Sequence, residues 1–229
     1  MKRIGILCAS DTELAPFLTR MHIEKVTEKA MLKFYEGTFG TVDAVAVYSG
    51  VCKVNAAIAA QILIDGFGAD AVINAGTAGG MDKDVELFDT IAAEQTVYHD
   101  VADDILTEFH PWMKTSYFQA DPALLDAARR YAKASPDPVR FGTIATGEAF
   151  IEDHRREEIC AAFAPLAVDM ESAAAAHVCF VNGIPFLSVR TVTDTAEHKG
   201  IENFEQNCEK ASEKAAEAVI GILEELKGS

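Results

Sequence analysis

Apolar runs rich in β-branched residues alternate with helical patterns along almost the whole chain. The runs cover residues 4–9, 42–48, 71–74, 90–97, 141–145, 166–168 and 186–192. Several are apolar throughout and do not alternate with polar residues, which is typical of strands covered on both faces. The intervening patterns predict helices at 54–67, 123–134, 172–181 and 202–226, the second with Asp121 as N-cap and Pro122 in its first turn. This alternation predicts an α/β fold with a mixed or parallel sheet.

Two segments do not follow this alternation. Residues 27–38 are more polar and predict an antiparallel hairpin inserted after the first helix. Residues 102–119 are aromatic and irregular, and we expect a long loop there, a feature that often serves function in compact proteins. With 229 residues and 49% hydrophobic content, the chain can form one substantial core, and a single domain over 1–229 is expected.

The composition disfavours several classes of partner. A formal charge of −16 repels nucleic acid and anionic membranes, so neither is expected as a partner. The five cysteines form no CxxC pair and the histidines no spaced ligand set, so we expect buried reduced thiols, no metal and no cofactor. The first apolar run stops at Asp11 and is typical of a strand, not of a signal peptide, and no run has the length of a membrane span. A cytoplasmic protein is expected.

Three carboxylates stand where strand-like runs give way to helical segments: Glu13, Glu171 and Asp194. Ligands of open α/β sheets bind beyond the carboxyl ends of the strands, and acidic groups gathered there suit acid/base chemistry on a neutral polyhydroxylated substrate. Each carboxylate also has a purely structural interpretation. Glu13 completes a capping box with Ser10, Glu171 suits the first turn of a helix, and residues 194–197 match a second capping box.

Two further features point to the same region. Residues 74–80 hold three glycines after a strand-like run, which suits either close backbone approach to a ligand or a plain tight turn, and match neither GxGxxG nor a P-loop. Arg190 lies inside an apolar run, where an unpaired guanidinium would be costly, and Glu13 is the partner that we favour. A purely structural ion pair is the alternative.

Seven motifs together resemble those of one enzyme family. They are the run from Ile4 to Glu13, residues 49–57, 74–80 and 98–100, Thr146-Gly147-Glu148-Ala149-Phe150-Ile151, Val168-Asp169-Met170-Glu171, and residues 189–194. In order and spacing the chain is similar to the 5′-methylthioadenosine/S-adenosylhomocysteine nucleosidases of the nucleoside phosphorylase superfamily. The resemblance implies a three-layer α/β/α sandwich around a mixed sheet, a homodimer and a role in methionine salvage. It also implies hydrolysis of the N-glycosidic bond of 5′-substituted adenosines, which releases adenine.

The resemblance also assigns roles to individual residues. Asp194 would protonate N7 of the leaving adenine, and Glu13, held by Arg190, would position the attacking water beside Thr77. Glu171 would bind the ribose hydroxyls. The remaining substrate-binding residues would be Ala78, Gly79, Phe150 (stacked on the adenine), Ile151 (its backbone on the adenine edge), Met170 (on the sugar) and Phe204 (at the 5′ substituent).

Departures from the family pattern are small at the chemical positions and larger in one loop. Asp169 stands where Glu is more common, Thr77 and Thr193 where Ser is, and Cys52 where Gly is. Residues 101–112 differ more. The sequence therefore leaves open which substrate is preferred among methylthioadenosine, adenosylhomocysteine, 5′-deoxyadenosine and aminodeoxyfutalosine. Two alternatives stay open as well: a phosphate-dependent purine nucleoside phosphorylase, and a nucleoside-binding sensor without turnover.

Overall fold

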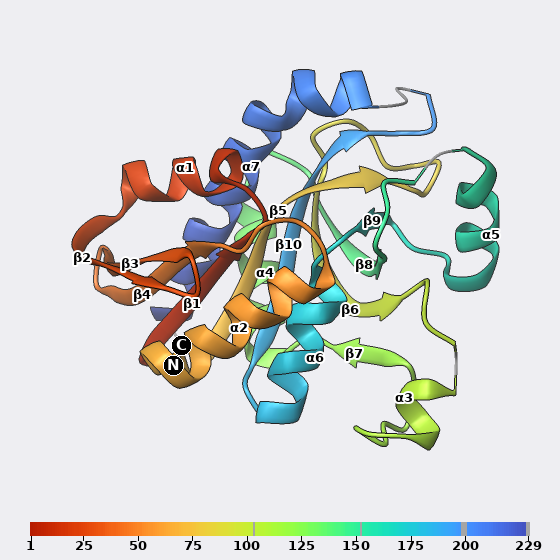
Figure 1. Cartoon of the computed structure of the whole chain (residues 1–229). Helices are drawn as coiled ribbons and strands as arrows, with labels where there is room; N and C mark the ends of the chain where they lie inside the picture. Colours follow the sequence, from red (N-terminus) through yellow and green to blue (C-terminus); the bar gives the residue numbers. More distant parts are fainter. Residues whose placement is uncertain (103, 152, 198–200, 228–229) are drawn as a thin grey trace.

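A ten-stranded mixed sheet with helices on both faces forms the molecule in the computed structural model, which describes residues 1–102, 104–151, 153–197 and 201–227 (Figure 1). The strands are β1 (Arg3–Cys8), β2 (His22–Lys29), β3 (Leu32–Phe39), β4 (Val42–Tyr48), β5 (Ala71–Gly80), β6 (Thr90–Tyr98), β7 (Tyr117–Gln119), β8 (Val139–Thr146), β9 (Ala167–Asp169) and β10 (Phe186–Asp194). The helices are α1 (Asp11–Arg20), α2 (Lys53–Phe67), α3 (Ile105–Glu108), α4 (Pro122–Ala134), α5 (Asp153–Phe163), α6 (Ser172–Asn182) and α7 (Ile201–Lys227).

The sheet curls back on itself at one side. Its order is β10-β6-β8-β9-β5-β1-β4-β3-β2, and β5 also pairs with β10, so five strands close into a small barrel. The strands β1, β4, β3 and β2 extend from this barrel as an open wing. Strands β1, β4, β5 and β10 run parallel to one another, whereas β9 runs antiparallel to β5. The pairing of β5 with β10 therefore brings the end of β9 next to the ends of β5 and β10, although β9 runs in the opposite direction.

Helices cover the sheet in two layers. Residues of α1, α4 and α7 share one core with one face of β1, and residues of α2 and α6 share a second core with the other face. Strand β1 illustrates the division, because Ile4, Ile6 and Cys8 belong to the first core and Leu7 to the second. This is the α/β sandwich with a mixed sheet that the sequence predicts, with nearly continuous apolar strands because both faces are covered.

Most predicted elements are confirmed, and several boundaries and connections are not. The hairpin in residues 27–38 is β2–β3, and Asp121 caps α4 through its side chain, as expected. The glycine segment 74–80 is part of β5 and not a turn. The expected loop 102–119 contains α3 and β7, and the sequence pattern did not reveal α5, whose amphipathic periodicity is weak. Asp194 ends β10 and the next helix begins at Ile201, so the second capping box is wrong.

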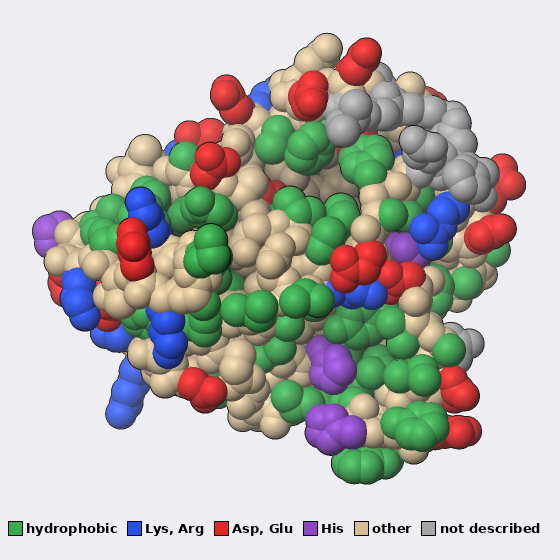
Figure 2. All heavy atoms as spheres, in the orientation of Figure 1, with side chains coloured by type: hydrophobic (Ala, Val, Ile, Leu, Met, Phe, Trp, Pro, Cys, Tyr) green, Lys and Arg blue, Asp and Glu red, His purple; other side chains and the backbone are tan. Residues whose placement is uncertain are grey.

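The surface beside α2, α3 and α6 carries large exposed apolar side chains: Val51, Val54, Ile58, Ile105, Phe109, Trp112, Phe180 and Val181. We call these eight side chains the apolar face. Hydrophobic side chains gather over this side in Figure 2, and α2, α6 and α3 lie along it in Figure 1. The alanines of 174–176 in α6 are buried within the chain and do not belong to this face. In the described part of the chain, no helix is long and apolar enough to cross a membrane.

Candidate active site

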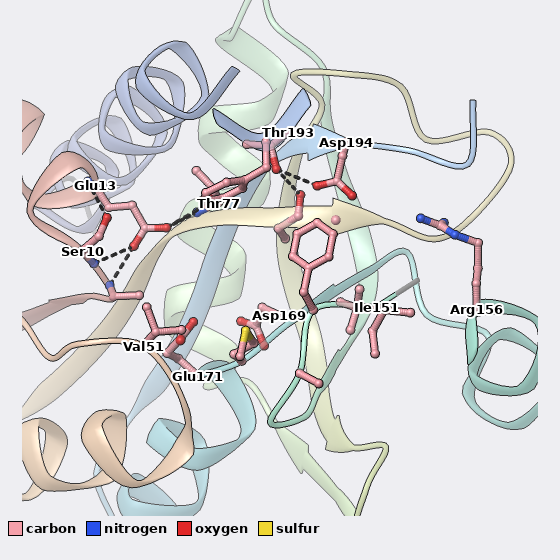
Figure 3. A pocket seen from close by; sticks show the side chains of 18 residues that line it. Ser10, Glu13, Val51, Thr77, Ile151, Arg156, Asp169, Glu171, Thr193 and Asp194 are labelled. Atoms are coloured by element: carbon pink, nitrogen blue, oxygen red, sulfur yellow. Dashed lines mark hydrogen bonds between the residues drawn. The ribbon is translucent and has the colours of Figure 1, made fainter. Parts of the chain in front are cut away.

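A pocket of about 240 Å³ opens where the ends of β1, β5, β9 and β10 meet (Figure 3). Ten of the eleven predicted site residues line it, and Arg190 lies directly behind them. The lining residues are Ala9, Ser10, Glu13, Val51, Thr77, Ala78, Gly79, Ala149, Phe150, Ile151, Arg156, Val168, Asp169, Met170, Glu171, Thr193, Asp194 and Phe204. The convergence of strand-end carboxylates is therefore confirmed. Glu13 and Asp194 stand at the ends of the parallel strands β1 and β10, whereas Glu171 follows β9, which runs antiparallel to β5 and reaches the pocket through closure of the sheet.

Glu13 belongs to the first turn of α1 and reaches across to β5. One carboxylate oxygen, Oε2, accepts from the backbone N–H of Ala9 and Ser10 at 2.7 and 3.3 Å. The other, Oε1, accepts from the N–H and the hydroxyl of Thr77 at 2.7 and 2.9 Å. A Cβ at position 76 would lie 2.4 Å from Oε1, so only glycine allows the carboxylate to rest against the strand. Glu13 thus completes a capping box with Ser10 and also faces the pocket, so both interpretations hold.

Glu171 stands at the N-cap of α6 but makes no capping hydrogen bond with its side chain. Its Oε1 instead accepts from the backbone N–H of Cys52 at 2.8 Å. Burial raises the pKa of Glu171 to about 7, against the lowering effect of the Arg190 charge, and the charges of Asp169 and Glu13 add to the rise. Near neutral pH, the Glu171 carboxyl group is therefore protonated in part of the molecules and ionised in the rest.

Arg190 on β10 is 1% exposed and lies among three carboxylates. Its Nη2 is 3.0 Å from Asp169 Oδ2 and 3.2 Å from Glu171 Oε2, whereas Nη1 is 3.8 Å from Glu13 Oε1. The prediction that Glu13 is the main partner of Arg190 is wrong, because the guanidinium lies closer to Asp169 and Glu171 than to Glu13. Burial alone would lower the pKa of Arg190, and the surrounding carboxylate charges outweigh this and raise it.

Asp194 ends β10 on the side of the pocket opposite Glu13, and Glu171 lies below them in the view of Figure 3. Its Oδ1 accepts from the Thr193 hydroxyl at 2.9 Å. Burial raises the pKa of Asp194, although the Thr193 hydrogen bond and the charge of Arg156 oppose the rise. A Cβ at position 79 would lie 3.2 Å from Oδ2, so Gly79 keeps that oxygen accessible to a ligand.

The far end of the pocket is apolar. Phe150 and Phe204 face each other edge to face with ring centroids 6.3 Å apart, and Ile151 is buried beside them. Among the residues that the structure describes, no group of three or more His, Cys, Asp or Glu side chains is arranged to hold a metal ion. The site thus combines an apolar slot with carboxylates at three positions around the cavity.

Comparison with known proteins places the chain in a family. The profile of the phosphorylase superfamily matches residues 3–224. A 5′-methylthioadenosine/S-adenosylhomocysteine nucleosidase of Geobacillus kaustophilus is 35% identical over 233 residues, which cover 98% of each chain. The nucleosidase of the same description from Exiguobacterium sp. is 34% identical, over 98% of this chain and 99% of its own.

The chain belongs to the 5′-methylthioadenosine/S-adenosylhomocysteine nucleosidase family of the phosphorylase superfamily. Solved structures agree with this assignment. An S-adenosylhomocysteine nucleosidase of Streptococcus pyogenes in complex with 5-methylthiotubericidin superposes with a TM-score of 0.90 and 30% identity, covering 97% of this chain and 96% of that one. A futalosine hydrolase of Helicobacter pylori also gives 0.90, with 27% identity and 98% coverage of both chains.

Eight of the eighteen lining residues were not predicted as site residues: Ala9, Ser10, Val51, Ala149, Arg156, Val168, Asp169 and Thr193. Ser10 and Val51 lie within quoted motifs but have no distinctive chemistry, and Asp169 was noted only as a departure from the family pattern. Arg156 lies on the unpredicted α5, donates to the backbone carbonyl of Gly80 and points toward Asp194 in Figure 3. Because the sequence of α5 has little amphipathic periodicity, neither the helix nor Arg156 on it was predicted.

Cys52 has an unusual backbone conformation, with φ +82° and ψ 165°, a region that is essentially restricted to glycine. This geometry points its N–H at Glu171. We predict that Cys52→Gly raises the free energy of unfolding by about 1 kcal/mol, because relief of about 1–3 kcal/mol of backbone strain exceeds the entropic cost of glycine. Urea denaturation measures the change.

The neighbouring Gly50 provides a matched control, because its φ is also +82°. Gly50→Ala forces a side chain into a positive-φ conformation and places its Cβ 3.0 Å from Asn55 Nδ2, so it should lower stability. Adenine release by Cys52→Gly should stay within about twofold of the parent, because the backbone N–H to Glu171 is retained. A less stable Cys52→Gly protein would show that the cysteine side chain contributes more than its conformation costs.

Proposed function

We propose that the chain hydrolyses the N-glycosidic bond of 5′-methylthioadenosine, S-adenosylhomocysteine and related 5′-substituted adenosines, which releases adenine and a 5′-substituted ribose. The observation that carries the proposal is the arrangement of Glu13 and Asp194 on opposite sides of one pocket, with Glu171 between them (Figure 3). The named activities of the relatives agree with it.

The leaving group needs a proton, and Asp194 supplies it. Breaking the bond between C1′ and N9 would leave negative charge on the purine, and protonation at N7 removes that charge. A buried carboxyl with a raised pKa keeps its proton to higher pH, which suits a general acid. The Thr193 hydroxyl occupies Oδ1 and leaves Oδ2 to face the base.

The nucleophile is a water molecule that Glu13 orients. As the oxygen of water bonds to C1′, its proton passes to the Glu13 carboxylate, and the C1′–N9 electron pair leaves with the purine. Four hydrogen bonds hold this carboxylate in place before substrate arrives, so little reorganisation is needed during the reaction.

Glu171 holds the ribose hydroxyls and stabilises the positive charge that develops on the sugar. With its pKa raised to about 7, the free enzyme contains both forms near neutral pH. A cationic ribose favours the anion, so the carboxylate interacts more strongly with the transition state than with the neutral substrate. Met170, next to it in the pocket, packs on the sugar.

The apolar end of the pocket receives the rest of the substrate. Phe150 stacks on the adenine, the Ile151 backbone contacts its edge, and Phe204 lines the space for the 5′ substituent. Thr77, Ala78 and Gly79 form the β5 wall between the two catalytic carboxylates. A further cation, Arg156, lies on the Asp194 side of the pocket in Figure 3, whereas a phosphate nucleophile would have to bind on the Glu13 side, where the carboxylate would repel it. Hydrolysis is therefore favoured over phosphorolysis.

The test is an assay of adenine release from methylthioadenosine, adenosylhomocysteine, 5′-deoxyadenosine and aminodeoxyfutalosine, with and without phosphate. We expect release from at least the first two at rates that do not depend on phosphate. Release that requires phosphate would identify a phosphorylase, and tight nucleoside binding with no release would identify a sensor.

The matched variant for this assay is Asp194→Asn, which keeps the size of the side chain but has no acidic proton. General acid catalysis contributes about 10²- to 10⁴-fold, and we expect a loss of kcat of at least that size in a folded protein. Turnover close to that of the parent would remove Asp194 from the role of acid.

Glu171→Gln tests the electrostatic role of the ribose carboxylate. The amide retains one acceptor but loses the charge, so ground-state binding should weaken modestly and transition-state binding more. We expect kcat to fall by a larger factor than KM rises. In the parent, kcat/KM should fall as pH drops through about 7, because Glu171 gains a proton, and this dependence should be absent in the variant. A rise in KM with unchanged kcat would leave Glu171 only a sugar-holding role.

We further propose that a homodimer of this chain, a single domain over residues 1–229, is the working form in the cytoplasm. The apolar face is contiguous with the pocket through Val51, which is 48% exposed and also lines the cavity. A large exposed apolar surface favours association, and a second copy offers the same surface by two-fold symmetry. Five free cysteines suit a reducing compartment.

Light scattering tests the assembly. At micromolar concentration we expect twice the 24.7 kDa mass of the chain. Trp112→Asp places a charge in the apolar face at a side chain that is 68% exposed, and it should shift the mass toward 24.7 kDa without loss of the fold. A parent protein that is monomeric and fully active would contradict the dimer.

A further inference from the structure

Lys53, the first residue of α2, connects three loops at the rim of the pocket. Its Nζ donates to both oxygens of Asp100, just beyond β6, at 2.8 and 2.9 Å. Its backbone N–H donates to Glu148 Oε1, beyond β8, at 3.2 Å. The Glu148 N–H in turn donates to Asp100 Oδ2 at 3.0 Å, which closes a cycle of three residues. We call this cycle the rim network.

The Lys53–Asp100 pair of the rim network is more sheltered than an ordinary surface ion pair, whereas the Glu148 side chain is 45% exposed. The side chains of Lys53 and Asp100 are each 19% exposed, and the ammonium lies 5.2 Å from the centre of the Tyr98 ring. Interactions between partly desolvated charges are stronger and less screened than exposed pairs. The positive end of the α2 dipole also attracts the negative charge of the Glu148 carboxylate. These contacts can therefore hold a loop, which a fully exposed pair rarely does.

The segment that the network holds is the connection from β8 to α5. Glu148 is followed directly by Ala149, Phe150 and Ile151, which line the apolar end of the pocket. Phe150 is 40% exposed and its ring contacts that of Phe204 edge to face, so burial does little to fix its position. The ends of the segment are anchored, because the Gly147 N–H donates to the Asp169 carbonyl at 3.1 Å and Ile151 is buried, and the contacts of Glu148 position the residues between them.

We propose that Lys53 and Asp100 are positioning residues, which hold residues 147–151 in the conformation that accepts the adenine ring. The inference rests on the proposed function, because it assigns the adenine to this loop. Neither side chain lines the pocket, so both act through Glu148. When the network is broken, the loop spends only a fraction of its time in the competent conformation, and the apparent dissociation constant rises by the inverse of that fraction. Once substrate is bound, the catalytic carboxylates are unchanged.

The experiment compares Lys53→Met with the parent in kinetics and in binding of the two products. We expect KM for methylthioadenosine and Kd for adenine to rise together, by about tenfold, with kcat within about threefold. The Kd for 5-methylthioribose should not change, because this product does not contact the loop. Lys53→Arg keeps the cation and should restore most of the affinity.

A second variant and a control make the result decisive. Asp100→Asn keeps one acceptor for the Glu148 N–H and should give a smaller rise, which also serves if Lys53→Met does not fold. Arg129→Met removes a pair of similar length, 2.9 Å to Glu94, between α4 and β6, and should change none of these constants.

Folded variants with KM and adenine Kd within twofold of the parent would overturn the inference. A fall of kcat that exceeds the rise of KM would also overturn it, because the network would then act on the chemistry. Failure of the proposed function is a separate outcome, since the parent protein itself would then release no adenine.

Discussion

The guanidinium of Arg190 is the interaction on which the site depends. It lies buried on β10 between Asp169, Glu171 and Glu13, which come from two other parts of the chain. A buried carboxylate without a partner is costly, and removal of one member of such a group typically costs about 3–5 kcal/mol. One cation next to three acids leaves net negative charge, which contributes, together with burial, to the raised pKa of Glu171. Burial is the main cause of the rise, and the Arg190 charge opposes it.

A network of buried polar side chains holds Arg190 and Asp169 in place. Asn74 accepts from Arg190 Nη2 at 2.6 Å and donates to the Leu7 carbonyl at 2.9 Å, which ties β10 to β5 and β1. Asp169 accepts from the Thr146 hydroxyl at 2.6 Å and from the Ser172 hydroxyl. Such networks stabilise a structure only when each member is satisfied, and this one is nearly so, with Arg190 Nε unpartnered among the described residues. The carboxylates are thus positioned before any ligand binds.

Helix starts are used for both structure and chemistry in this molecule. Glu13 caps α1 and faces the pocket, the Cys52 N–H at the start of α2 holds Glu171, and the next amide, that of Lys53, holds Glu148. Unpaired N–H groups at helix N-termini attract carboxylates, so these positions orient acids without extra binding residues. The strained backbone of Cys52 is consistent with this use, because its conformation points the amide N–H at the pocket carboxylate of Glu171.

The sequence by itself predicted most of the elements and ten of the residues that line the pocket. Apolar runs marked most strands because burial on both faces requires them, and motif spacing identified Glu13, Glu171 and Asp194. Tertiary structure decided what depends on contacts between distant segments. Closure of β5 against β10 brought β9 to the pocket and turned Arg190 toward Asp169 and Glu171, and it kept the 74–80 glycines in a strand. Arg156 escaped prediction because the helix that carries it, α5, has a weak amphipathic periodicity. The rim network escaped prediction because hydrogen bonds between distant loops produce no pattern along the sequence.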